Sequence, residues 1–182
     1  MDLYDRNNVY APNRDFVKKE LYEDEALRLE VSKLKFRFMT DAQALLHGDL
    51  HTGSIFIRQD STKIFDCEFG TYAPMGYDVG NVVANLIFAY DNGLSTDDGP
   101  FCDWCLKTIE ETVDLFIEKF SRKYDEAVTE PMAKVKGFKE WYFGGILKDT
   151  AGYAGTELHR RTVGMANVVD VTAIQDKTKR LL

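Results

Sequence analysis

Apolar residues recur at helical spacing early in the chain. Four of them lie three or four positions apart: Leu27, Val31, Leu34 and Phe38. Charged residues occupy many of the positions between them, so the spacing predicts one amphipathic helix over residues 18–43. Residues 1–17 include the turn-forming segment Tyr10–Arg14, and we predict an extended entry segment there.

The pattern changes between residues 44 and 77, where short apolar runs alternate with polar stretches. Ile55–Ile57 and Ile64–Phe65 are separated by a short polar turn, which is typical of an antiparallel β-hairpin. A polar loop at residues 47–54 precedes this hairpin, and an irregular segment follows it. We therefore expect a small hairpin that carries two loops.

The remaining residues, 78–182, have the pattern of a helical subdomain. Asp78 precedes the apolar segment Val79–Tyr90 and is placed to cap the N-terminus of a helix. Phe101–Ala127 carries a second helical stripe, and Pro131 is placed to open another helix. The whole chain is thus predicted to be a single lobe of the α+β class, mainly α-helical.

Composition and charge exclude several classes of protein. The chain has 182 residues, of which 45% are hydrophobic, with 23 Lys and Arg against 30 Asp and Glu. The net charge of −7 argues against nucleic acid or an anionic membrane surface as a partner, because these ligands attract clustered cations. The longest uncharged apolar stretch, Val79–Tyr90, is too short to span a membrane.

The cysteines favour a reducing, cytoplasmic environment. There are three, an odd number, and the first residues lack the apolar stretch of a signal peptide. Cys102 and Cys105 form a lone C-x-x-C pair, which without a second pair is weak evidence for a zinc or redox site. We expect both to be buried on a helix.

Three carboxylates lie on the two loops beside the predicted hairpin. Asp49 belongs to the segment His-Gly-Asp-Leu-His, and Asp66 and Glu68 follow the second strand. Neighbouring like charges raise one another's pKa, so such clusters usually share a proton or hold a divalent cation. Asp49 alone could also be a carboxylate that caps its own loop.

Four blocks of sequence occur in a distinctive order. They are His47–Ser54 (HGDLHTGS), Asp66–Phe69 (DCEF), Ala73–Gly80 (APMGYDVG) followed by Asn85 and Leu86, and Ala154–Gly164 (AGTELHRRTVG). Together they resemble the C-terminal lobe of the 5-methylthioribose kinase family, and the resemblance extends over residues 26–164. The broader group of kinases that phosphorylate aminoglycosides or choline shares only the first two blocks.

The resemblance implies a protein-kinase-like lobe and ATP-dependent phosphorylation of 5-methylthioribose at its 1-hydroxyl, a step of methionine salvage. Asp49 would orient that hydroxyl and accept its proton. Asp66 and Glu68 would hold the Mg²⁺ that bridges the ATP phosphates, and in an extended segment both would point to the same side. Arg160 and Arg161 would bind the sugar, since guanidinium forks suit vicinal hydroxyls and phosphoryl charge; without the resemblance they could be solvated residues of a helix face.

Two residues would support the loop that contains Asp49. Asp78 would hydrogen-bond the loop backbone, and His47 would pack or hydrogen-bond beneath it. His47 and His51 also form an H-x-x-x-H pair, but a loop offers no helical face and no third zinc ligand is close in sequence. Ser54 occupies a position where the broader group has a metal-binding Asn, and we do not assign it as a ligand.

No phosphate-binding glycine loop and no V-A-I-K motif occur in the 182 residues. We therefore expect a C-terminal lobe whose N-terminal lobe is absent, and which is inactive until that lobe is supplied. Its partners would be the sugar, ATP and the missing lobe, with a second copy of the chain as a further candidate. The alternatives are a phosphotransferase for an aminoglycoside, choline or homoserine, and a non-catalytic remnant or binding module.

Overall fold

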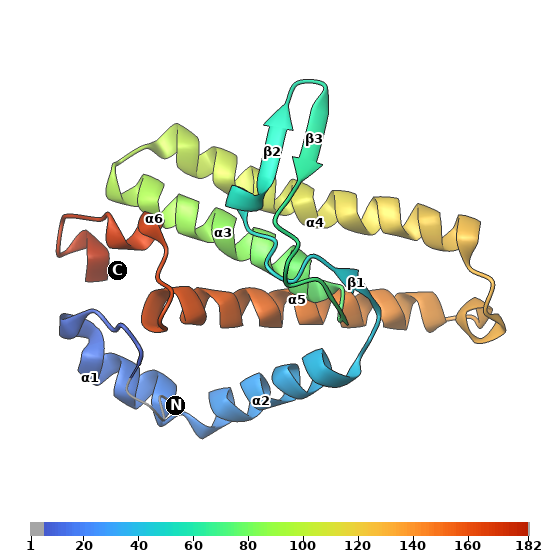
Figure 1. Ribbon diagram of the computed structural model, residues 1–182, viewed down its shortest axis with the longest axis horizontal. Coiled ribbons are helices and arrows are strands. Elements are labelled where there is room, and N and C mark those ends of the chain that lie inside the picture. Colours follow the sequence, from blue (N-terminus) through green and yellow to red (C-terminus); the bar gives the residue numbers. More distant parts are fainter. Residues whose placement is uncertain (1–5, 182) are drawn as a thin grey trace.

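The computed structural model describes residues 6–181, and most of them are helical (Figure 1). Its α-helices are α1 (Arg14–Val17), α2 (Glu25–Thr40), α3 (Gly76–Ser95), α4 (Gly99–Ala127), α5 (Phe138–Val163) and α6 (Val169–Thr172). Its strands are β1 (Ala44–Leu46), β2 (Ile55–Arg58), β3 (Ser61–Ile64) and β4 (Thr71–Ala73). Single turns of 3-10 helix cover Ala11–Asn13, Thr52–Ser54, Pro131–Lys134 and Lys179–Leu181, and a π-helical turn covers Lys18–Tyr22. The predicted α+β, mainly α-helical fold with a small hairpin is confirmed.

Helix α3 is the centre of the helical layer, with α5 and α4 packed against it (Figure 1). Two glycines of α3 permit a close approach to α5. A Cβ atom on Gly76 would lie 2.6 Å from the backbone nitrogen of Thr150, and one on Gly80 would lie 2.8 Å from that of Ala154. The core between these helices is apolar and includes Ala84, Leu86, Phe88, Phe143, Ile146 and Tyr153.

Helix α2 is fastened to α5 by polar contacts. The Tyr153 hydroxyl donates to the carbonyl oxygen of Leu34 at 3.0 Å, and Nη1 of Arg37 lies 2.5 Å from Oδ1 of Asp149. Arg37 also pairs with Asp41 through Nε, at 3.0 Å. The Asp149 side chain is only 1% exposed, and its burial raises the pKa of that carboxyl, while the charge of Arg37 lowers it. The ion pair of the half-buried Arg37 with the buried Asp149 thus helps to fix the end of α2 that leads into β1.

Two small antiparallel sheets organise the loops. β1 pairs with β4, with Leu46 opposite Thr71, and β2 pairs with β3, with Ile55 opposite Ile64. The chain leaves β1, forms the loop 47–54, makes the β2–β3 hairpin and returns through residues 65–70 to β4. The β1–β4 pairing therefore brings both loops to the base of the hairpin, which projects from the helical layer (Figure 1).

Several predicted boundaries are wrong. The extended entry segment 1–17 is wrong from Ala11 onward, where 3-10 and α-helical turns occur, and residues 1–5 lie outside the described part. The single helix over 18–43 is interrupted because the carboxylate of Asp24 accepts from the Leu27 backbone N–H at 2.9 Å and starts a new helix. Pro131 opens only a 3-10 turn, and α5 begins after Gly137.

Asp78 is not the N-cap of its helix. Helix α3 begins at Gly76, so Asp78 lies inside the first turn. Its carboxylate accepts a hydrogen bond from the backbone N–H of His47 and does not cap the helix. Within residues 6–181, no helix combines the length and the apolar character that crossing a membrane requires.

Candidate functional site

The HGD loop (residues 47–54) is held by the first turn of α3. The Asp78 carboxylate accepts hydrogen bonds from the backbone N–H groups of His47, at 2.7 Å, and Gly48, at 3.1 Å. Nδ1 of His47 accepts from the Asp49 backbone N–H at 3.3 Å, so its Nε2 is left to donate to the carbonyl oxygen of Phe65, 2.7 Å away. These contacts fix the backbone on both sides of Asp49 and join the loop to the end of the hairpin.

The DCE loop (residues 65–70) is a turn and not an extended segment. Asp66 has a φ angle of +67°, and the Gly70 N–H donates to the carbonyl oxygen of Cys67 at 3.0 Å. The segment is therefore not extended, contrary to our expectation, and the argument that Asp66 and Glu68 point to the same side for that reason is wrong. Both side chains belong to exposed residues.

The two carboxylates of the DCE loop were also expected to gather with Asp49. Within residues 6–181 there is no group of three or more His, Cys, Asp or Glu side chains arranged to hold a metal ion. Mg²⁺, however, is commonly bound by one or two carboxylates together with substrate phosphates and water. Asp66 and Glu68 are exposed and offer carboxylate oxygens, which are the donor atoms that Mg²⁺ prefers.

The HGD and DCE loops touch through their backbones at Gly48. This residue has a φ angle of +87°, and a Cβ atom there would lie only 2.2 Å from the carbonyl oxygen of Phe69. A residue other than glycine is therefore excluded both by its own backbone conformation and by the neighbouring loop. The contact sets the spacing between the loop of Asp49 and the loop of Asp66 and Glu68.

We expect Gly48→Ala to destabilise the protein by about 1–3 kcal/mol, because alanine must adopt a strained φ angle or push the DCE loop away. Urea denaturation of the wild type and the variant measures the difference. Gly99→Ala is the matched control, since a Cβ atom at Gly99 meets nothing within 4 Å. Equal losses in the two variants would contradict the role given to the contact.

The end of α5 brings two cations to Asp49. Arg160 and Arg161 each point Nη2 at Oδ1 of Asp49, in both cases at 3.2 Å. The Nε atom of Arg160 lies 2.6 Å from Oε2 of Glu157, and that of Arg161 lies 2.8 Å from Oε1. The two arginines thus reach from the helix to the HGD loop, and both are also paired with the buried carboxylate of Glu157.

Sequence reasoning missed Glu157, although its spacing was a usable signal. Residues three and four positions apart lie on the same side of a helix, which places Glu157 beside both arginines. The four charges of Glu157, Arg160, Arg161 and Asp49 balance to zero. Burial opposes the charge of Arg160, but its hydrogen bond and ion pair with Glu157, helped by Tyr77 and Asp49, raise its pKa.

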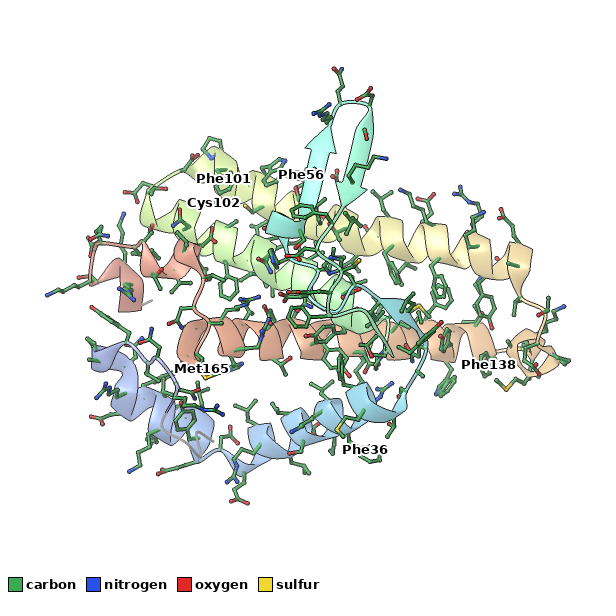
Figure 2. The ribbon with its side chains drawn as sticks, in the orientation of Figure 1. Phe36, Phe56, Phe101, Cys102, Phe138 and Met165 are labelled. Carbon is green, nitrogen blue, oxygen red and sulfur yellow. The ribbon has the colours of Figure 1, made fainter. Side chains whose placement is uncertain are left out.

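The other residues considered from sequence have structural contacts. The Ser54 hydroxyl is buried and lies 3.2 Å from Nε2 of His51. Cys102 and Cys105 are buried on α4, as expected, and Figure 2 shows Cys102 beside the start of that helix. Cys67 is exposed on the DCE loop.

Comparison with known proteins identifies similar chains. The family described as "Phosphotransferase enzyme family" matches residues 5–100. A methylthioribose kinase of Bacillus cereus (strain B4264) is 39% identical over 178 residues, which cover 98% of this chain and 44% of the relative. A methylthioribose kinase of Geobacillus sp. (strain WCH70) is 41% identical over 178 residues, covering 98% and 43%. The chain therefore spans less than half the length of these curated relatives, and the resemblance to methylthioribose kinases is confirmed.

Proposed function

The chain belongs to the phosphotransferase enzyme family, and from this premise we propose that it supplies the substrate- and metal-binding half of an ATP-dependent 5-methylthioribose kinase. The observation that carries the proposal is the convergence of Arg160 and Arg161 on one carboxylate oxygen of Asp49, each at 3.2 Å. A carboxylate and two guanidinium forks at one point suit a polyhydroxylated substrate that is to be phosphorylated.

Each residue of this cluster has a role that follows from its chemistry. Phosphoryl transfer depends mainly on positioning the attacking hydroxyl and on neutralising charge that develops. Asp49, on a backbone fixed by Asp78, would orient the 1-hydroxyl of the sugar and accept its proton. Arg160 and Arg161 would donate to neighbouring hydroxyls of the sugar and offset negative charge on the transferred group.

Asp66 and Glu68 are the residues that would hold Mg²⁺. The cation, when bound with ATP, would neutralise phosphate charge. The Gly48–Phe69 contact supports this assignment, because it keeps the loop of Asp66 and Glu68 directly against the loop of Asp49.

An exposed apolar surface supports the view that this chain works with a further part of a longer kinase. Large apolar side chains of the two small sheets and the DCE loop are exposed: Leu45, Phe56, Ile57, Ile64, Phe65, Phe69 and Tyr72. Figure 2 shows Phe56 at the base of the hairpin, and its ring stacks on that of Phe65 at 4.4 Å. Apolar surface of this extent is commonly covered by another protein segment. Since the relatives are more than twice as long as this chain, we propose that their additional, N-terminal part covers this surface and supplies the nucleotide-binding loop.

The charge of the site bears on the alternative substrates. Aminoglycosides and choline are cations and call for unpaired carboxylates, whereas Asp49 and Glu157 are both paired with the two arginines. 5-Methylthioribose is neutral and matches a cluster whose four charges balance. Homoserine carries both signs of charge and is distinguished by assay.

The test is release of ADP from Mg-ATP in the presence of 5-methylthioribose. We expect no activity from this chain alone and activity from the reconstituted kinase, meaning this chain mixed with the separately expressed N-terminal part of the Geobacillus relative. Aminoglycoside, choline and homoserine replace the sugar as controls for substrate class. Absence of activity, with both pieces shown to be folded and associated, would favour a binding module or remnant over a kinase.

A further inference from the structure

Glu157 is a buried carboxylate to which the proposed reaction gives no direct task. The residue is 3% exposed and lies on the inner side of α5, one turn before the two arginines. Burying a charged carboxylate is costly unless it is paired and hydrogen-bonded. Its partners therefore indicate why a charge is placed there.

Glu157 accepts from the Nε atoms of both guanidinium groups, and Asp49 accepts from their Nη2 atoms. Oε1 accepts from Nε of Arg161 at 2.8 Å and from Nη2 of Arg160 at 3.0 Å, and Oε2 accepts from Nε of Arg160 at 2.6 Å. The Nη2 atoms of both arginines then reach Oδ1 of Asp49 at 3.2 Å. The contacts of the arginines with Asp49, where the sugar is proposed to bind, are therefore longer than the contacts of their Nε atoms with Glu157.

We propose that Glu157 is a positioning residue, which holds Arg160 and Arg161 in the arrangement that binds the sugar. The inference rests on the proposed function, because it concerns the same site and the same substrate. Arginine has a long, flexible side chain whose ordering opposes binding, and a guanidinium that is already fixed loses less freedom when it binds. When Asp49 turns to the sugar hydroxyl, the contacts to Glu157 keep both forks in place.

Glu157 also offsets the mutual repulsion of two neighbouring cations. Arg160 and Arg161 are consecutive in sequence and both approach the same oxygen atom. Removal of the Glu157 charge would leave two positive groups facing a single carboxylate. We therefore expect the arginines to separate, and the sugar to lose the paired donors that recognise it.

The decisive variant is Glu157→Gln in the reconstituted kinase. We expect the KM for 5-methylthioribose to rise at least about tenfold, because small displacements of positioning groups have large effects, while the KM for ATP stays unchanged. The matched control is Thr150→Val, which replaces another buried polar residue of α5 whose hydroxyl donates to the Ile146 carbonyl oxygen of its own helix. An equal rise in both Michaelis constants would indicate a general structural defect and overturn the proposal.

A double-mutant cycle tests whether Glu157 acts through the arginines. If it does, Glu157→Gln has a much smaller effect on the sugar KM in an Arg161→Ala background than in the wild type. Fully additive effects would overturn the proposal. Should Glu157→Gln fail to fold, Glu157→Asp retains the charge on a shorter side chain that cannot reach both Nε atoms. Its sugar KM is expected to rise as well, and an unchanged value would contradict positioning.

A readout without substrate separates this inference from the proposed function. Solvent exchange of the Nε–H protons of Arg160 and Arg161, followed by ¹⁵N NMR, reports whether the side chains are held. We expect slow exchange in the wild type and fast exchange in Glu157→Gln. A wild-type kinase that does not phosphorylate the sugar contradicts the proposed function, whereas unchanged exchange in the variant overturns the positioning role.

Discussion

Replacing Asp49 with Asn is expected to lower kcat of the reconstituted kinase about 10²–10⁴-fold, the usual contribution of a positioned general base. Asn has the same size and its Oδ1 still accepts hydrogen bonds, and the shorter contacts to Glu157, at 2.6 and 2.8 Å, still hold both arginines. It cannot take the proton of the sugar hydroxyl. Initial rates at saturating ATP and sugar measure the effect, and thermal unfolding checks that the variant is folded.

The matched control for this variant is Asp60→Asn. Asp60 lies in the turn between β2 and β3 and is exposed, so the substitution changes the net charge equally at a position remote from the arginine cluster. We expect its kcat to remain within a factor of about two of the wild type, as for most surface changes. A kcat for Asp49→Asn close to that of Asp60→Asn would remove Asp49 from the chemistry and leave it as an ion-pair partner of the arginines.

The parts of the fold that depend on local pattern could be predicted from the sequence. The β2–β3 hairpin follows from two short apolar runs of Ile and Phe on either side of a polar turn, and residues 99–127 form one helix along an apolar stripe. The start of α2 could not be predicted in this way. The capping hydrogen bond from Leu27 to Asp24 outweighed a continuous helical pattern.

The candidate site shows a different limit. Asp49 and Arg161 are 112 positions apart, and no periodicity connects them, so only the family resemblance placed them together. The contact of Asp78 with the HGD loop was likewise expected only from the family resemblance, because by pattern an Asp before an apolar helix usually caps it, whereas here two loop N–H groups occupy the carboxylate. The turn of the DCE loop depends on the positive φ angle of Asp66, which side-chain pattern does not reveal.

The second large effect is expected from Arg37→Met, which removes the cation beside the buried Asp149. Breaking a buried ion pair by removing one partner usually costs about 3–5 kcal/mol, because the remaining charge is uncompensated. Urea denaturation at neutral pH measures the loss. The control is Arg28→Met, on the same helix, whose side chain is 41% exposed and pairs with the exposed Glu25; we expect a loss below about 1 kcal/mol there.

The pH dependence of this loss identifies Asp149 as its cause. Burial raises the pKa of Asp149 above its ordinary value of 3.8, and Arg37 lowers it, so without Arg37 the pKa rises further. A raised carboxyl pKa in the folded state costs nothing when the group is protonated in both states, and the cost grows as pH rises towards the folded pKa. The deficit of Arg37→Met is therefore expected to be larger at neutral pH than near about pH 5. Adding Asp149→Asn to Arg37→Met is expected to restore part of the stability and abolish this difference between the two pH values. A deficit that is equal at both pH values, or unaffected by the second substitution, would show that Arg37 stabilises α2 through packing and not through its charge.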